Sequence, residues 1–236
     1  MYEDAQEIFM KQQLSQTDVL MTTNTLFLDI ETIPADESHR DALKYLYARK
    51  SEKKKKKNGT EGNGVPFSDA EDFEQFLLGT SFDGSFGRIL CIGYAMNDDR
   101  TAVFAGDEPK ILAEFWNLAR MANLFVGHNV MDFDLRFIYQ RSIVCGVRPS
   151  VELNFARYRS FPIYDTMKEW VKWSNTNIGL EHIALSLGLP TPKDGIDGSQ
   201  VFDFYKAGKI IEIAEYCKRD VETTRAVYRR MKFLTV

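Results

Sequence analysis

Short apolar runs bounded by turn residues predict the strands of this chain. In the first, acidic side chains interrupt the apolar ones, and Pro34 follows as a break. Two further runs flank the polar turn Asn97–Arg100, so we expect an antiparallel hairpin beside the first strand. The predicted strands are Leu26–Glu31, Ile89–Met96, Thr101–Ala105, Asn123–Gly127 and Pro162–Thr166.

Apolar residues that recur every three or four positions predict helices between and after these strands. One of them is ended by Gly188, with Pro190 beyond it. An antiparallel start followed by alternating helices and strands is typical of an α/β fold in which a mixed sheet carries helices on its faces. The predicted helices are Ile111–Ala119, Phe133–Cys145, Ile178–Leu187 and Ile210–Met231.

Two regions lie outside this pattern. We interpret residues 1–24 as an N-terminal tail and residues 25–236 as a single domain, with an inserted loop region at about 36–85. Within the insertion we expect a helix at Ser38–Ala48, then the irregular stretch SEKKKKKNGTEGNGVP (51–66), then a helix-like segment SDAEDFEQFLLG (68–79). The run Lys53–Lys57 could grip phosphates, but a solvated, disordered loop is the favoured interpretation.

Composition narrows the class of protein. The 236 residues carry a net charge of -4, so the chain lacks the global positive charge of proteins that bind nucleic acid by bulk electrostatics. The three cysteines have neither the spacing of a zinc site nor an even-numbered disulfide framework, which favours a reducing cytoplasm. No apolar run of about 18 residues and no signal peptide is found, so we expect no membrane association.

Two acids of the first strand are the first candidates for chemistry. Asp29 and Glu31 stand two positions apart, so both side chains leave the same face of the strand, near its end. Two carboxylates there would repel each other, and a hard divalent cation such as Mg²⁺ or Mn²⁺ would relieve that repulsion. A pair of acids with this spacing is also common by chance in solvent, so further acids are needed.

The last predicted helix offers a second pair. Tyr216 and Asp220 are four residues apart, so they project from one face, which Ile213 would seat against the sheet. An acid and a phenol turned toward a core need partners, and a metal with its bound water would supply one. The alternative is an exposed pair on a helix that is otherwise rich in charged residues.

A third group connects a buried strand to a helix, the position at which open α/β sheets meet their ligands. Asp134 shares the inward face of the helix with Phe137, whereas Asp132 points elsewhere and is the second choice as a ligand. Asn129 could cap the helix or reach the ligand. Phe133 could stack on a base.

Other polar and aromatic residues are weighed against structural roles. We interpret His128 as a structural hydrogen-bonding residue, and Asp165 as a helix cap in preference to an acid that supports the site. Ile33, just past Glu31, could touch a terminal base, and Phe161 is an alternative stacking residue. The sequence does not choose between them.

In order along the chain, DIET (29–32), HNVMDFD (128–134) and YCKRD (216–220) resemble the three motifs of the DEDDy branch of the ribonuclease H-like 3′-5′ exonucleases. The resemblance covers Leu26 to about Met231. It is greatest to the predicted exonucleases related to the proofreading domain of family B DNA polymerases, and it includes GIDGSQVFDFYKAGKIIEIAEYCKRDVETT. Each motif alone is weak, whereas their order and spacing together are specific.

The resemblance implies a ribonuclease H-like five-stranded mixed sheet and a two-metal mechanism with Mg²⁺ or Mn²⁺. It implies hydrolysis from the 3′ end of DNA, single-stranded by expectation, with release of nucleoside 5′-monophosphates. The residues it assigns to catalysis are Asp29, Glu31, Asp134, Tyr216 and Asp220, of which the four acids hold the metals. Tyr216 would orient the attacking water, and Asn129, Phe133 and Ile33 would contact the substrate.

Three alternatives stay open at this point. The same acids would serve a 3′-5′ exoribonuclease, because they act on the phosphate and not on the sugar. A non-catalytic nucleic-acid-binding module would keep the fold but is expected to have lost an acid, and none of the four is missing. A glycosidase-like pair of carboxylates would leave Tyr216 and Asp220 without a role.

Overall fold

A five-stranded mixed sheet forms the centre of the fold. The structure is a computed structural model that describes residues 24–57, 70–191 and 195–234. The strand order is β3-β2-β1-β4-β5, with antiparallel pairing of β1 to β2 and of β2 to β3, and parallel pairing of β1 to β4 and of β4 to β5. The predicted mixed sheet is thus confirmed. The strands are β1 (Thr25–Ile33), β2 (Arg88–Met96), β3 (Ala102–Ala105), β4 (Leu124–Gly127) and β5 (Ile163–Asp165).

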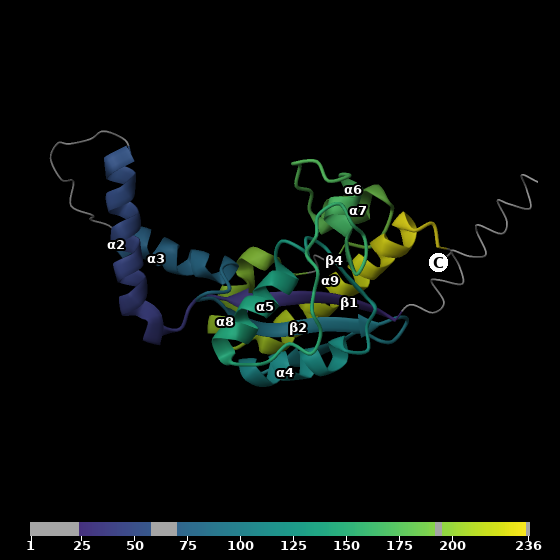
Figure 1. Cartoon of the computed structure of the whole chain (residues 1–236), viewed down its shortest axis with the longest axis horizontal. Helices are drawn as coiled ribbons and strands as arrows, with labels where there is room; N and C mark the ends of the chain where they lie inside the picture. The colour runs from purple at the N-terminus through teal and green to yellow at the C-terminus, as the bar shows by residue number, and fades with distance from the viewer. Residues whose placement is uncertain (1–23, 58–69, 192–194, 235–236) are drawn as a thin grey trace, which may run out of the picture.

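Three long helices cover the two faces of the sheet (Figure 1). α4 (Glu108–Ala119) and α5 (Asp134–Cys145) pack on one face, whereas α9 (Ile210–Met231) crosses the other and contacts β1, β2 and β4. α9 has the bounds that the sequence predicts. In the described part of the chain, no helix is both long and apolar enough to cross a membrane. The remaining helices are η1 (Glu37–His39), α2 (Arg40–Lys57), α3 (Ala70–Leu78), η2 (Gly79–Phe82), α6 (Thr166–Trp170), α7 (Leu180–Ser186), η3 (Gly198–Gln200) and α8 (Val201–Lys206).

The alternation of side chains along β1 decides which residues meet α9. Leu26, Leu28 and Ile30 join the apolar cluster that includes α4 and α5. Phe27 packs on the other face, where its ring meets that of Tyr228 from α9 edge to face at 5.5 Å. The odd-numbered positions between Phe27 and the end of the strand therefore also face α9, and two of them are acids.

A β-bulge lies beside these acids. The register of β1 against β2 shifts between Glu31 and Thr32, so that Glu31 pairs with Cys91 and Thr32 with Ile89. Leu90 is the extra residue of the bulged strand, which explains why Leu90 and Cys91, neighbours in sequence, both pack in the cluster on the α9 side. The bulge changes the direction of the strands at the point where the carboxylates lie.

The insertion between β1 and β2 is helical where the structure describes it. The expectation of irregular chain after Ala48 was wrong, because α2 continues to Lys57 and includes the whole run Lys53–Lys57. Lysine is a good helix former, and neither proline nor glycine occurs between Pro34 and Gly59. α2 and α3 project away from the sheet (Figure 1, left). Nearly all of the interpreted tail, residues 1–23, lies outside the described residues.

Candidate active site

Two carboxylates of β1 and two polar residues of α9 meet between the sheet and the helix. Glu31 is 7% exposed and Asp29 is partly exposed. Tyr216 and Asp220 stand one turn apart on α9 and are 7% and 9% exposed. Both acids of β1 interact electrostatically with Asp220 and with Tyr216. The structure therefore brings the first and third sequence motifs together.

Glycine at position 93 allows α9 to approach the sheet closely. Gly93 pairs with Asp29 in the antiparallel ladder, and its amide donates to the Cys217 sulfur at 3.2 Å. A Cβ atom at position 93 would lie 2.8 Å from that sulfur and 3.1 Å from the Cys217 carbonyl oxygen. A larger residue would push α9, and the acid it carries, away from β1.

Asp134 joins the cluster from the other side of the sheet. It is the first residue of α5, it is 3% exposed, and its Oδ1 accepts a hydrogen bond of 3.0 Å from the Ile30 amide. Ile30 lies between Asp29 and Glu31, so this bond fixes the start of α5 against the two β1 acids. The second motif is thereby added to the other two.

The four carboxylates strongly disfavour one another's charge. Burial is the largest cause that raises the pKa of Asp29 well above its usual range, followed by the charges of Asp220, Asp134 and Glu31. The pKa of Glu31 is raised by burial, by Cys91, and by Asp220 and Asp134. The pKa of Asp134 is raised to about 7. Burial is the largest cause of this rise, and the charges of Asp165 and Asp220 add to it. Hydrogen bonds from the amides of Asp134 itself and of Ile30 oppose it.

This donor set fits hard divalent cations. Besides burial, the main influences on the charges of Asp29 and Glu31 are those of acids and cysteine thiols, which do not compensate negative charge. Carboxylate oxygens are the ligands that Mg²⁺ and Mn²⁺ prefer, and positive charge placed between them would reverse the cost of burying them. The residues that could hold such ions are Asp29, Glu31, Asp134 and Asp220.

Cys217 belongs to the same site and was missed in the sequence. Its sulfur lies 3.5 Å from Asp29 Oδ2, and the ligand atoms of Asp29, Glu31 and Cys217 lie within 4.8 Å of one another. Burial, then Cys91 and the charges of Asp29 and Glu31, raises the pKa of the Cys217 thiol well above its usual range, so the thiol keeps its proton and donates a hydrogen bond to Asp29. Its spacing of four from both Ile213 and Val221 could have placed it on the buried face of α9.

Asp165 fixes the loop between β4 and α5. Its carboxylate caps α6 by accepting from the Met167 and Lys168 amides, as the sequence predicts. It also accepts from the Asn129 amide at 3.0 Å and from the Met131 amide at 3.1 Å. One buried acid, 1% exposed, therefore holds two segments at the carboxyl ends of β4 and β5.

His128 has the structural role expected of it. Its Nε2 donates to the Ile178 carbonyl oxygen at 2.8 Å, and its Nδ1 lies 3.0 Å from the Thr166 hydroxyl. Burial lowers the pKa of His128 to about 4 against the opposing effect of that carbonyl. The imidazole is therefore neutral at pH 7 and links the loop to the chain before α7.

The residues predicted to contact substrate lie around the acids but differ in exposure. Asn129 is partly exposed and adopts a left-handed backbone with φ of 58°. Phe133 is half-buried, and its ring centroid lies 6.3 Å from that of Phe82, an exposed residue that the sequence analysis did not single out. Ile33 is 3% exposed and packs in the cluster that contains Tyr216. Their roles in binding substrate stay predictions.

Asp132 stands apart from the acidic cluster. Burial acts to raise its pKa, but the hydrogen bond and charge of Lys168, with the charges of Arg136 and Arg157, lower it overall. Its Oδ2 lies 2.8 Å from Lys168 Nζ, and its Oδ1 lies 3.7 Å from Arg136. Asp132 is therefore an ion-paired residue, and Asp134 is the acid of the second motif that joins the cluster.

Comparison with known proteins finds one family that matches more than half of the chain. The family described as "Predicted 3′-5′ exonuclease related to the exonuclease domain of PolB" matches residues 89–236, which include Asp134, Tyr216 and Asp220 but not the two acids of β1. No curated protein matches the chain.

Among solved structures, the chain is similar to the family B DNA polymerase from the hyperthermophilic archaeon Pyrobaculum calidifontis, with a TM-score of 0.60 and 14% sequence identity. The similarity covers 89% of this chain and 24% of the polymerase, so the chain spans about a quarter of that protein's length. At this identity the likeness shows the fold.

Proposed function

We propose that this chain, which belongs to the family of predicted 3′-5′ exonucleases related to the exonuclease domain of PolB, hydrolyses phosphodiester bonds from the 3′ end of single-stranded DNA. The products are nucleoside 5′-monophosphates. The observation that carries the proposal is the meeting of four carboxylates and a tyrosine from β1, α5 and α9 in one buried cluster. Free, buried thiols at Cys91 and Cys217 suit a reducing, cytoplasmic location.

In this proposal Asp29, Glu31, Asp134 and Asp220 hold two divalent cations, Mg²⁺ or Mn²⁺. When bound, such ions supply Lewis-acid stabilisation of the phosphate and lower the pKa of water. The chain's own contribution is positional. The Asp134 bond to the Ile30 amide and the close packing at Gly93 fix the carboxylates relative to one another before any substrate arrives.

Tyr216 is assigned to orient the attacking water. Burial is the main cause that raises the pKa of its hydroxyl above the usual range, and the charges of Asp220, Glu31 and Asp29 add to it. The phenol therefore keeps its proton at pH 7 and acts through a hydrogen bond, not as a base. The hydrogen bond between Tyr216 and Asp220 fixes its direction.

Tyr216→Phe is accordingly expected to slow hydrolysis by about 10- to 100-fold, in the range of one positioned hydrogen bond. Binding of Mn²⁺, measured by electron paramagnetic resonance, should stay within about twofold of wild type because no carboxylate changes. Tyr205→Phe, a half-exposed tyrosine on α8, is the matched control. Loss of Mn²⁺ binding in Tyr216→Phe would show that the hydroxyl acts through the metal site instead.

Degradation of end-labelled oligonucleotides tests the proposed function. Single-stranded DNA labelled at its 5′ end should give a ladder that shortens from the 3′ end in Mg²⁺ or Mn²⁺, whereas DNA labelled at its 3′ end should release labelled mononucleotide at once. EDTA should stop both reactions. Cleavage of a matching RNA alone would replace the proposal with an exoribonuclease, and the absence of metal-dependent cleavage of either would favour a binding module.

A further inference from the structure

A polar cavity lies next to the acidic cluster and has no role in the proposed chemistry. Its volume is about 240 Å³, just below the range of about 300–1,000 Å³ for pockets that enclose a whole ligand. It is therefore suited to part of a larger ligand. The residues that line it are Asp132, Arg157, Tyr158, Lys168, Trp173, Ser174, Asn175 and Asn177.

Its position relates it to the path of the substrate. Asp132 lines the cavity and precedes Asp134 by two residues, so their Cα atoms are at most about 7 Å apart. Lys168 belongs to α6, which follows β5 directly, and Asp165 fixes α6 to the loop that carries Asn129. Cavity and acids thus share the edge of the sheet formed by the carboxyl ends of β1, β4 and β5, where ligands of open α/β sheets bind.

The chemistry of the cavity suits a nucleotide. Arg157 and Lys168 supply two positive charges against the single charge of Asp132, and Asp132 holds the Lys168 ammonium at 2.8 Å. Tyr158 is 74% exposed, and its ring lies 5.3 Å from that of Trp173. A basic surface with an exposed aromatic ring is the combination by which proteins hold single strands without regard to sequence.

The backbone around the cavity supports a specific use of the rings. Tyr158, Lys172 and Trp173 have φ angles of 63°, 50° and 62°. Bulky side chains rarely adopt this left-handed region, and such conformations persist where the surrounding structure fixes them, often at ligand sites. The Trp173 indole is fixed from its other side, because its Nε1 donates to Glu169 at 3.1 Å.

We infer that this cavity binds one nucleotide of the single-stranded substrate on the 5′ side of the scissile phosphate, with its base on Tyr158 and a phosphate on Arg157 and Lys168. The inference rests on the proposed function for the direction of the strand. The subsite gives the enzyme affinity for chains of several nucleotides and keeps the 3′ end at the acids. It contributes nothing to a diester too short to reach it.

Binding measured without metal tests the subsite apart from catalysis. In EDTA no metal ion offsets the repulsion between the carboxylates and the 3′-terminal phosphodiester, so the affinity for 5′-fluorescein-labelled (dT)₁₂ depends on surfaces beside them. Fluorescence anisotropy should show Kd raised about 10-fold in Tyr158→Ala, the scale of one lost stacking contact. Arg157→Ala should raise Kd similarly and lower the slope of log K against log salt by about 0.7.

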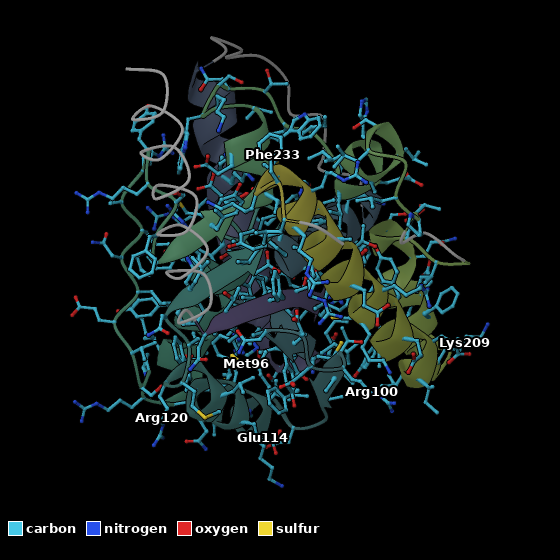
Figure 2. The ribbon with its side chains drawn as sticks, turned by 90° about the vertical axis from the view of Figure 1, so that its right-hand side faces the viewer. Met96, Arg100, Glu114, Arg120, Lys209 and Phe233 are labelled. Carbon is cyan, nitrogen blue, oxygen red and sulfur yellow. The ribbon has the colours of Figure 1, made fainter. Side chains whose placement is uncertain are left out.

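Arg120→Ala is the matched control, because Arg120, labelled in Figure 2, is exposed at the end of α4 and precedes the amino end of β4, whereas the cavity lies at the carboxyl ends of β4 and β5. Its Kd should equal that of wild type. In Mg²⁺, kcat/KM for the p-nitrophenyl ester of thymidine 5′-monophosphate should be the same in all three variants, whereas kcat/KM for (dT)₁₂ should fall about 10-fold in the two cavity variants only.

Undetectable binding of (dT)₁₂ by wild type, or a Kd in Tyr158→Ala and Arg157→Ala that equals the wild-type Kd, overturns the inference even if the protein proves to be an exonuclease. Failure of the proposed function has a different signature. The protein would then hydrolyse neither the ester nor the oligonucleotide, while Arg157→Ala and Tyr158→Ala would still weaken binding of (dT)₁₂. Equal losses on the ester and on (dT)₁₂ would show that the variants disturb the acids, and would also overturn the subsite.

Discussion

Asp220→Asn is expected to lower the rate of DNA hydrolysis by at least about 1,000-fold, which corresponds to about 4 kcal/mol of lost transition-state stabilisation. Asp220 acts on the charges of Asp29, Glu31 and Asp134, so it is the acid that the other three share. Asparagine keeps the size of the side chain and removes one negative charge, which weakens any cation held between the four. The rate is measured with 5′-labelled single-stranded DNA in saturating Mn²⁺.

Glu222→Gln is the control for charge on the same helix. Glu222 is exposed and accepts a hydrogen bond from the Thr101 hydroxyl at 2.8 Å, away from the cluster. The rate of DNA hydrolysis by Glu222→Gln should therefore remain within about twofold of wild type. In EDTA, Asp220→Asn should also unfold at a higher temperature than wild type, since it removes one repelling charge. Activity of Asp220→Asn within 10-fold of wild type would remove Asp220 from the proposed metal site.

The centre of the fold could be predicted because local pattern and global structure agree there. The hairpin around the turn Asn97–Arg100 and the amphipathic helix at Ile210–Met231 each bury one regular face, so periodicity alone places them. The two acids of β1 followed from the same rule, because alternate residues of a strand share a face. Pairing of these acids with α9 required the resemblance, since no local signal joins Asp29 to residues 188 positions away.

What the sequence left open depends on contacts between distant segments. α2 was predicted to end near Ala48, because a run of lysines looks equally like solvated loop and exposed helix when the rest of the structure is unknown. The short helices α6 and α8 are too brief to show periodicity. Cys217 and the cavity around Tyr158 and Trp173 acquire their meaning from what folding places beside them.

The four clustered carboxylates make stability depend on both pH and metal. In EDTA the folded pKa of Asp134 is about 7 against an ordinary value of 3.8, so between these values the folded protein binds a proton that the unfolded chain does not. The free energy of unfolding contributed by this group is therefore fully present below about pH 4 and is lost as pH rises to about 7, at about 1.4 kcal/mol per pKa unit. Asp29 and Glu31, whose pKa values are also raised, add to this loss.

His128 acts in the opposite direction and must be separated. Its folded pKa of about 4 lies below the ordinary value of 6.5, so its contribution to stability grows as pH rises through this range. Urea unfolding of wild type and Asp134→Asn in EDTA at several pH values isolates the acid, because His128 is common to both. As pH rises from 4 to 8, the free energy of unfolding of Asp134→Asn should increase relative to that of wild type by about a few kcal/mol. Its Asn oxygen can still accept from the Ile30 amide.

Saturating Mg²⁺ or Mn²⁺ should reverse the loss in wild type. At about 100 times Kd a ligand that binds only the folded protein stabilises it by about 2.7 kcal/mol, which raises Tm by about 5 to 10 °C for a chain of this size. The rise in Tm should be larger at pH 8 than at pH 6. At the lower pH the carboxylates bind protons, which compete with the metal ions. Asp134→Asn should show a smaller rise at both pH values. Two results together would refute the two-metal site. In EDTA, the Tm of wild type would not fall relative to that of Asp134→Asn as pH rises, and added metal would not raise the Tm of wild type. The cluster would then be stabilised by groups other than cations.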